Sequence, residues 1–390
     1  MSLPDTASRI LCLLALQLAL PFAAGAAGAA GTVAPTDGAA VSSADETMTV
    51  TDALGRRVTV PRSPDHVICS GPGCLRLLAY LRCLDAVVAV DDAETARPQF
   101  AGRPYALANP QLQELPVFGE FRGRDNPELI VALEPRPEVI FKTFPDTGTG
   151  PDELEKKTGI PVLVLSYGDF FGYRQDYASA LRTVAAVMGR EERAEEVIAF
   201  LGGTVADLGT RTAGISDHAR PSCFVGGIAF RGPQGLLSTE PAYLPFLFVG
   251  ADSPAFDPDK ELEQQLHADL AKEQIVRWDP DVIFLDAATL QAAPELNALN
   301  QLENDPVYRQ LAAVKHGEVY VVIPFKWYGQ NYGSTIADAY FVGKVLYPER
   351  FADVEPVEKA DRIYRFLVGD AVFDRMNEVF QGMLFRRITF

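Results

Sequence analysis

The sequence predicts an α/β protein of two lobes, each a mostly parallel sheet flanked by helices, joined by a single long helix. Short apolar runs rich in β-branched residues alternate with helical patterns, and this alternation is typical of parallel sheets covered by helices. One long helical pattern separates two such regions. A segment of helix, proline turn and strand also occurs once in each region, as expected for two related lobes.

The composition is that of a folded protein with little affinity for polyanions. The chain has 390 residues, of which 48% are apolar and 22% charged, as in globular proteins. Because one core rarely grows past about 250–300 residues, this length predicts two or three packing units. With 52 acidic and 35 basic side chains, the formal net charge is −17. Because phosphate groups are bound by lysine and arginine, this charge argues against a nucleic-acid partner.

The first 46 residues predict an exported protein. Arg9 precedes an uncharged apolar run at 10–20, which is shorter than the roughly twenty residues that span a bilayer. Small residues around Ala26 fit the rule for signal-peptidase cleavage, so residues 1–26 are expected to be a signal peptide cleaved near Ala26. Residues 27–46 are rich in Gly, Ala, Ser and Thr and are expected to be a flexible tether. We therefore expect a periplasmic protein.

Residues 47–188 are expected to form the N-terminal lobe. Alternating residues at 48–51 and 58–60 flank a turn sequence at 52–56, which predicts a β-hairpin. Buried strands and helices then alternate, which indicates a parallel sheet. The expected strands are 66–69, 86–90, 138–141 and 162–165, and the expected helices are 75–84, 126–133, 151–158 and 173–188.

Residues 189–214 are expected to be the helix that joins the lobes. Gly189 interrupts the preceding helix, and apolar residues then recur with helical spacing from Val197 to Leu208. A helix of about twenty residues spans roughly 30 Å, about the width of a small domain, so it can connect two lobes.

Residues 215–390 are expected to form the C-terminal lobe, in which strands and helices alternate again. The sequence leaves open whether the tail after about Val368 packs on this lobe or reaches a partner. The expected strands are 223–225, 281–284 and 318–323, and the expected helices lie near 241–248, 334–346 and 355–368.

An internal repeat supports the division into two lobes. The segment 128–141 is similar to 273–284, with two extra residues in the first copy. Each copy reads as a short helix, a proline-bearing turn and a strand. Each helix begins with a glutamate, Glu128 or Glu273, at the end where the helix dipole favours a carboxylate.

In this order, these segments resemble the substrate-binding proteins of ABC importers for iron–siderophore complexes, haem and cobalamin. The resemblance runs from about residue 47 to the C-terminal helices. It rests on the opening segment 50–61, both copies of the repeat, segment 158–165 and the closing segment 337–348. The family implies two α/β lobes joined by one long helix. It also implies a ligand held between the lobes and delivered to a membrane permease with its ATPase.

The resemblance implies which residues meet the partners. In the family, one glutamate on each lobe meets arginine on the permease, and Glu128 and Glu273 match those positions. The ligand is expected where loops leave the carboxyl ends of the strands. Aromatic and cationic residues in those loops suit a negatively charged metal chelate, with iron the first choice. The expected ligand-binding residues are Arg122, Tyr167, Arg231, Lys326, Trp327, Tyr328 and Tyr332.

Other ligands and another role remain open. Haem, cobalamin, a metal ion and an oxyanion are alternative ligands, and presentation of the ligand to a sensor is an alternative role. A bare metal ion is less favoured because the histidines, at 66, 218, 267 and 316, are far apart in sequence. Direct binding of Fe(III) by Tyr328 or Tyr332 with Asp169 is a minor alternative.

An enzyme is not expected, and neither is a cofactor. The sequence contains no Gly-x-Ser-x-Gly elbow, P-loop or HExxH zinc helix. The glycines of the sequence Cys69-Ser70-Gly71-Pro72-Gly73-Cys74 are read as a tight turn between strand and helix. Cys69, Cys74, Cys83 and Cys223 remain after cleavage, and either one disulfide among the first three or buried thiols fits an exported protein.

Overall fold

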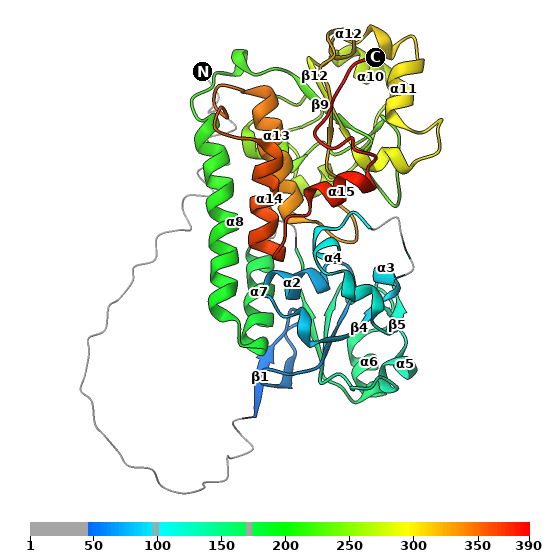
Figure 1. The fold of residues 1–390 in the computed structure, drawn as a ribbon, viewed down its shortest axis with the longest axis vertical. Coiled ribbons are helices and arrows are strands. Elements are labelled where there is room, and N and C mark those ends of the chain that lie inside the picture. The colour runs from blue at the N-terminus through cyan, green and yellow to red at the C-terminus, as the bar shows by residue number, and fades with distance from the viewer. Residues whose placement is uncertain (1–45, 96, 98–100, 169–173) are drawn as a thin grey trace, which may run out of the picture.

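The computed structural model describes residues 46–95, 97, 101–168 and 174–390, and these form two α/β lobes connected along one side by long helices (Figure 1). The predicted fold class is confirmed. The predicted signal peptide and nearly all of the predicted tether lie outside the described residues. Within the described part of the chain, none of the helices has the length and apolar character needed to cross a bilayer.

The N-terminal lobe is built on a six-stranded sheet of order β6-β5-β4-β3-β7-β8. All neighbouring strands run parallel except β5 and β6. The fully buried strands β3, β7 and β8 are mostly apolar because helices cover both faces of the sheet, and their polar residues stand at the carboxyl ends of β3 (Ser70) and β7 (Lys142 and Thr143). The strands are β3 (Val67–Ser70), β4 (Val87–Asp91), β5 (Val117–Glu120), β6 (Arg124–Asp125), β7 (Val139–Thr143) and β8 (Val162–Leu165).

Short helices and a hairpin complete this lobe. The predicted hairpin is present as β1 (Thr47–Thr51) and β2 (Arg57–Pro61), paired antiparallel. The helix predicted at 75–84 ends earlier, because Arg82 adopts a left-handed backbone conformation with φ 60° that a helix cannot continue through. The helices are α2 (Cys74–Tyr80), α3 (Asp92–Thr95), α4 (Pro104–Ala108), α5 (Pro127–Val131) and α6 (Pro151–Thr158).

Two consecutive helices, α7 (Arg174–Met188) and α8 (Glu191–Thr212), lead from one lobe to the other. With 22 residues, α8 is about 33 Å long. Its buried positions, among them Val197, Leu201 and Leu208, recur every three or four residues and form one apolar face. Glutamates in the first turn and Arg211 in the last turn complement the helix dipole.

The C-terminal lobe has a smaller sheet of order β14-β13-β12-β9, in which only β14 is antiparallel. Two-residue strands β10 and β11 form a separate antiparallel pair. The strands are β9 (Cys223–Gly226), β10 (Ser238–Thr239), β11 (Ala268–Asp269), β12 (Val282–Asp286), β13 (Val319–Val322) and β14 (Arg387–Ile388). The helices are α9 (Leu244–Val249), α10 (Lys272–Trp278), α11 (Ala298–Asn304), α12 (Ala312–His316), α13 (Tyr332–Leu346), α14 (Pro356–Val368) and α15 (Phe373–Val379).

The C-terminal tail packs on the protein itself. Helix α14 contacts α2 and α4 of the N-terminal lobe, and α15 also contacts α4. The last strand, β14, then pairs with β13, where Val319 lies opposite Ile388. The tail therefore completes the sheet of the C-terminal lobe. This is the first of the two possibilities that the sequence left open, packing on this lobe.

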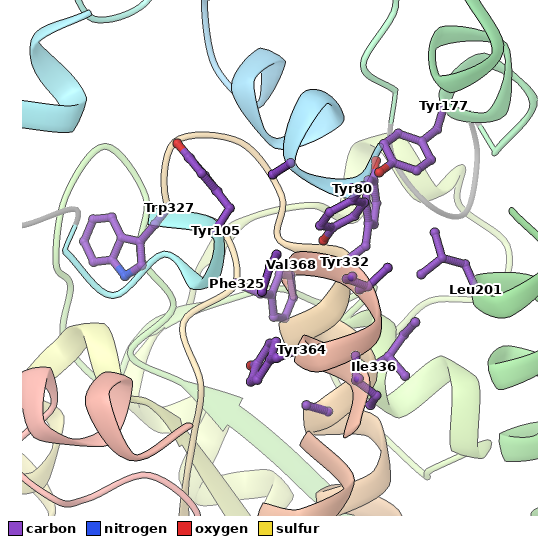
Figure 2. Packing of buried hydrophobic residues seen from close by; sticks show 14 of the residues in the cluster. Tyr80, Tyr105, Tyr177, Leu201, Phe325, Trp327, Tyr332, Ile336, Tyr364 and Val368 are labelled. Atoms are coloured by element: carbon purple, nitrogen blue, oxygen red, sulfur yellow. The ribbon is translucent and has the colours of Figure 1, made fainter. Parts of the chain in front are cut away.

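One apolar core continues from lobe to lobe. Figure 2 shows Tyr80 of α2, Tyr177 of α7, Leu201 of α8 and Tyr332 of α13 packed in it, and each is buried. Tyr177 and Tyr332 make an edge-to-face ring contact at 4.2 Å between centroids. Separating the lobes would expose this core, so packing as well as α8 holds them together.

Candidate functional site

One loop of the C-terminal lobe, residues 323–331 between β13 and α13, meets the N-terminal lobe just after β3, at Gly73, and at the carboxyl end of β4, at Asp91. We call this loop the inter-lobe loop. Its Gly329 lies directly against the N-terminal lobe, since a Cβ there would be 3.1 Å from the backbone nitrogen of Gly73. With φ 85° and this close backbone approach, only glycine fits position 329 without strain.

Buried Arg76 of α2 holds the inter-lobe loop. Its guanidinium, 1% exposed, donates to the carbonyl of Gln330 at 2.6 Å and to that of Trp327 at 3.4 Å. The Tyr167 hydroxyl, which accepts a hydrogen bond from Arg76, donates to the same Gln330 carbonyl at 2.7 Å. Hydrogen bonds from a charged group to carbonyls are strong in a buried place, so this contact joins the two lobes firmly.

Tyr328 makes a second contact between the lobes. Its hydroxyl donates to the carboxylate of Asp91, at the end of β4, and accepts from the Arg122 backbone N–H at 3.0 Å. Burial raises the pKa of Asp91 to about 7, although the hydrogen bond from Tyr328 acts in the opposite direction. Arg103 lies 5.7 Å from the Tyr328 ring and forms a buried ion pair with Glu94 at 2.6 Å.

The predicted aromatic ligand contacts have the positions of core residues. Tyr332 is fully buried in the first turn of α13 and donates to the Gly168 carbonyl at 3.0 Å. Its ring stacks on that of Tyr167 at 5.8 Å. Trp327 and Tyr328 are also buried. Contact of these four side chains with a ligand stays a prediction, and in this structure their surfaces are turned to the protein.

The three predicted cations differ in their surroundings. The ammonium of Lys326 is paired with the buried carboxylate of Glu240 at 2.8 Å and donates to the Leu266 carbonyl at 2.8 Å. Arg122 and Arg231 are exposed, and among the described residues neither guanidinium forms an ion pair. Both have left-handed backbone conformations, with φ 63° and 56°. These two arginines are therefore the predicted cations best placed to meet an anion.

Two other exposed aromatic residues lie in connections that follow the carboxyl ends of strands, where the ligand is expected, but are not among the predicted ligand-binding residues. Phe144, which follows β7, is 45% exposed and has φ 51°. Phe230, before Arg231, is 41% exposed and stacks on His267 at 3.8 Å. The His267 ring also lies 3.1 Å from the Ser238 hydroxyl. A lone histidine carries no sequence signal, so its place beside Phe230 required the fold.

No group of three or more His, Cys, Asp or Glu side chains among the described residues is arranged to hold a metal ion. Asp169, named with Tyr328 and Tyr332 as an alternative iron site, lies outside the described residues. Cys69, Cys74, Cys83 and Cys223 are buried thiols without disulfides, which is one of the two states that the sequence allowed. Burial raises the pKa of Cys69 and of Cys223, so these thiols are unreactive.

The repeated glutamates occupy matching places on the two lobes. Glu128 and Glu273 are exposed in the first turns of α5 and α10, which lie near opposite ends of the molecule in Figure 1. Glu128 lines a surface hollow of about 740 Å³ with Val131, which is 45% exposed. On α10, Val276 is 38% exposed. Each glutamate thus has an exposed apolar neighbour on its own helix.

Comparison with known sequences gives two matches. A sequence model of the periplasmic binding protein family matches residues 74–324. The iron-uptake system-binding protein of Bacillus subtilis (strain 168) is 25% identical over 199 residues, which are 48% of this chain and 58% of that protein. The chain therefore spans less than two thirds of the length of this curated relative.

Solved structures show the same fold. A periplasmic solute binding protein from Veillonella parvula is similar with a TM-score of 0.65 and 18% identity, over 86% of this chain and 96% of that one. The molybdate periplasmic binding protein of Haemophilus influenzae, bound to molybdate, has a TM-score of 0.61 and 20% identity over 83% and 98%. Helicobacter pylori CeuE with Ni(II) bound has a TM-score of 0.52 and 18% identity over 87% and 100%. At these identities, the likeness concerns the fold alone.

Proposed function

This chain belongs to the periplasmic binding protein family, and on that premise we propose that it captures an anionic iron complex between its lobes for an ABC importer. The family resemblance predicted from the sequence is confirmed, and the family and its similar structures are solute-binding proteins and not enzymes. Membership indicates an exported protein. The signal peptide at 1–26, with cleavage near Ala26, is part of this proposal.

The observation that carries the proposal is the pair of exposed arginines, Arg122 and Arg231, one from each lobe, each in a connection that follows the carboxyl end of a parallel strand, β5 or β9. In a chain with net charge −17, a guanidinium on each lobe that has no carboxylate partner among the described residues favours an anionic solute over a cation. The iron-uptake relative and the chelating chemistry of iron favour a ferric complex as that solute. The molybdate-bound structure makes an oxyanion the second candidate.

Tryptophan fluorescence tests this proposal. Trp327 lies in the inter-lobe loop and Trp278 at the end of α10, and the chain has no other tryptophan. We expect a Trp278→Phe variant, in which only Trp327 reports, to show saturable quenching below micromolar concentration with a ferric siderophore, haem or ferric citrate. A response to molybdate or free Fe(III) alone would replace the chelate with a smaller solute. If the protein responds to none of these probes and does not respond to cobalamin either, the proposal is contradicted.

We further propose that Glu128 and Glu273 dock the loaded protein on the permease. Exposed charges steer association more than they add affinity, which suits transient docking. Replacing both with alanine is expected to leave ligand affinity unchanged and to abolish uptake of the labelled ligand by cells. A control variant, Glu196→Ala with Glu358→Ala, removes two exposed carboxylates from α8 and α14 and should transport normally. Normal uptake by the Glu128/Glu273 variant would reject the docking assignment.

A further inference from the structure

The internal repeat places an exposed valine beside the glutamate of each copy. Both copies have the pattern of a glutamate, a variable residue, an isoleucine and a valine, at 128–131 in α5 and at 273–276 in α10. In both, the isoleucine is fully buried, whereas the valine is 45% exposed in α5 and 38% exposed in α10. Residues three apart lie on the same face of a helix. Each lobe therefore presents a carboxylate and an apolar side chain next to each other at its surface.

The packing of the lobes does not explain these valines. Ile130 belongs to one apolar cluster of the N-terminal lobe, with Phe118, and Ile275 belongs to a cluster of the C-terminal lobe, with Phe224. These isoleucines already anchor the two helices. A single exposed apolar residue is ordinary on a protein surface. The same residue at the same step from a glutamate, on both lobes, indicates a contact that both lobes make with one partner.

The surface around α5 is hollowed and more apolar than one valine would make it. The hollow of about 740 Å³ that Glu128 and Val131 line lies on one side of the helix start. A second hollow of about 620 Å³ is lined by Leu129, which is 46% exposed, and by Val117 of β5, which is 38% exposed. The two hollows share residues 126–127, so they adjoin, and side chains of a partner can enter both.

The start of α5 is held in a fixed conformation. The Asn126 side chain accepts hydrogen bonds from the backbone N–H groups of Glu128 at 3.0 Å and Leu129 at 3.2 Å. Pro127, at the first helical position, presets the backbone dihedral angle of the first turn. A surface that is ordered before it binds loses little conformational entropy on binding.

Helix α10 presents a smaller apolar surface. Gln274, also exposed, stands where α5 has Leu129. Lys272 in the first turn of α10 forms an ion pair with Asp305, so the segment that carries Val307, 43% exposed, lies beside this helix. The two lobes thus share the glutamate and the valine, and the N-terminal lobe has the larger apolar area around them.

The charge and the spacing of the two surfaces indicate the kind of partner. Glu128 and Glu273 are exposed on a chain with net charge −17, so the partner needs basic groups at both places. In Figure 1, α5 and α10 lie toward the two ends of the molecule, both on the side away from α8. A partner that meets both must extend along the molecule and offer the same chemistry twice, as a permease surface built from two similar halves does.

We propose that Val131 and Val276 are the apolar half of the docking contact, each packed against an apolar side chain that lies beside a basic one on the permease. The valines and Leu129 hold the complex together, whereas the glutamates guide its formation. The contact at α5 is the stronger of the two because Leu129 and the two hollows add apolar area. This inference rests on the docking role proposed above for Glu128 and Glu273.

Photo-cross-linking in living cells identifies the partner of each surface. The photoreactive residue p-benzoylphenylalanine replaces Val131 or Val276. The matched control position is Val357, an exposed valine beside an exposed glutamate in the first turn of α14 and outside the repeat. We expect both repeat positions to cross-link to the permease subunit of an ABC importer, identified by mass spectrometry, and the control position not to do so.

Association with that importer, purified in lipid nanodiscs, measures the contribution of each side chain. Val131→Ser and Val276→Ser should each weaken the complex about threefold to tenfold, as expected for removing a half-exposed valine from a buried contact, and Val357→Ser should not. The repeat itself supplies a reciprocal pair of variants. Leu129→Gln, which copies the second lobe, should weaken the complex, and Gln274→Leu, which copies the first, should strengthen it.

The rate constants separate docking from a structural effect. The valine variants should mainly raise the dissociation rate constant. Glu128→Ala should mainly lower the association rate constant and its dependence on salt. Each variant should keep the unfolding midpoint and the fluorescence response of wild type to the solute probes, because these side chains are exposed and far from the inter-lobe loop in sequence.

Three results would overturn the inference. If the repeat positions cross-link only to a second copy of this chain, or to nothing, the valines do not meet a permease. If the valine variants associate as wild type does while the Glu128/Glu273 variant fails, docking by the glutamates stands and the apolar contact is rejected. If all of these variants associate and transport normally, the docking role in the proposed function fails and this inference fails with it.

Discussion

The inter-lobe loop and the two turns Phe121-Arg122-Gly123 and Phe230-Arg231-Gly232 are built from the same kinds of residue, aromatic and cationic, but have opposite surroundings. In the loop, Trp327 and Tyr328 are buried, Lys326 is paired with Glu240, and the main-chain carbonyls are bonded to Arg76. In the turns, Arg122 and Arg231 are exposed and their backbone is strained. The loop is satisfied from within the chain, and the turns are not.

This difference indicates two separate roles beside one another. Buried polar groups are normally paired inside the protein, so the inter-lobe loop bonded to Arg76 is a structural contact that sets the distance between the lobes. We call this loop with Arg76 the floor, and the two exposed turns that carry Arg122 and Arg231 the rims. Arg122 and Arg231, which are exposed and have a strained backbone, make no such internal ion pair among the described residues. Residue type alone therefore does not tell a binding residue from a structural one, whereas the presence of an internal partner does.

The largest expected effect comes from removing the support of the floor. Arg76→Met should lower the free energy of unfolding by on the order of 3 kcal/mol or more, because charged hydrogen bonds contribute about 1.5–3 kcal/mol each and the loop carbonyls would be left buried without a donor. Arg122→Met, on the rim, should change it by less than about 0.5 kcal/mol. Urea denaturation of both variants checks this, and equal losses of stability would remove the distinction between floor and rim.

A smaller effect concerns the pH dependence of the contact between Tyr328 and Asp91. Burial raises the pKa of Asp91 to about 7, above the ordinary value for aspartate near 3.9. The folded protein therefore binds this proton more tightly than the unfolded chain does, so the contribution of Asp91 to stability falls as pH rises from about 4 to about 7.

Asp91→Asn should remove this dependence. Each pKa unit corresponds to about 1.4 kcal/mol, so the stability of wild type relative to the variant should decrease by on the order of 2 kcal/mol between pH 5 and pH 7.5. Taking the difference cancels the titration of Asp286, another buried carboxyl whose pKa is raised to about 7 by burial. A constant difference across this range would mean that Asp91 is charged in the folded protein.

The sequence predicts the scaffold well because strands, helices and their periodicity are local properties. The positions of β3, β7, α8 and α14 agree with the expected ranges within a few residues. The strands β6, β10, β11 and β14 have two residues each and no periodicity, so only their partners define them. The helix at 75–84 was too long because the left-handed conformation of Arg82 has no signal in the sequence.

The site is predicted less well, for a physical reason. The sequence identified Arg122 and Arg231 as cations in loops at the ends of strands. It could not distinguish them from Lys326, whose partner Glu240 lies far away in the chain. The burial of Trp327 and Tyr328 likewise depends on Arg76, whose bond to Gln330 joins residues 254 apart. The sequence Phe-Arg-Gly, which occurs at 121–123 and again at 230–232, was the available signal. The left-handed conformation of the arginine in both copies became known only from the structure.

The smallest expected effect is the movement of the lobes on binding. A fixed floor, a helix of about 33 Å and a shared core all resist closure, so ligand should bind at the rims with little change in shape. In small-angle X-ray scattering, we expect the radius of gyration to change by less than about 1 Å when a tightly bound probe is added, similar to the backbone movements of preorganised complexes. The Arg76→Met variant, with the floor loosened, should compact more than wild type under the same conditions. A large compaction of wild type would mean that the inter-lobe loop leaves Arg76 during binding, and Trp327 and Tyr328 would then become accessible to the ligand.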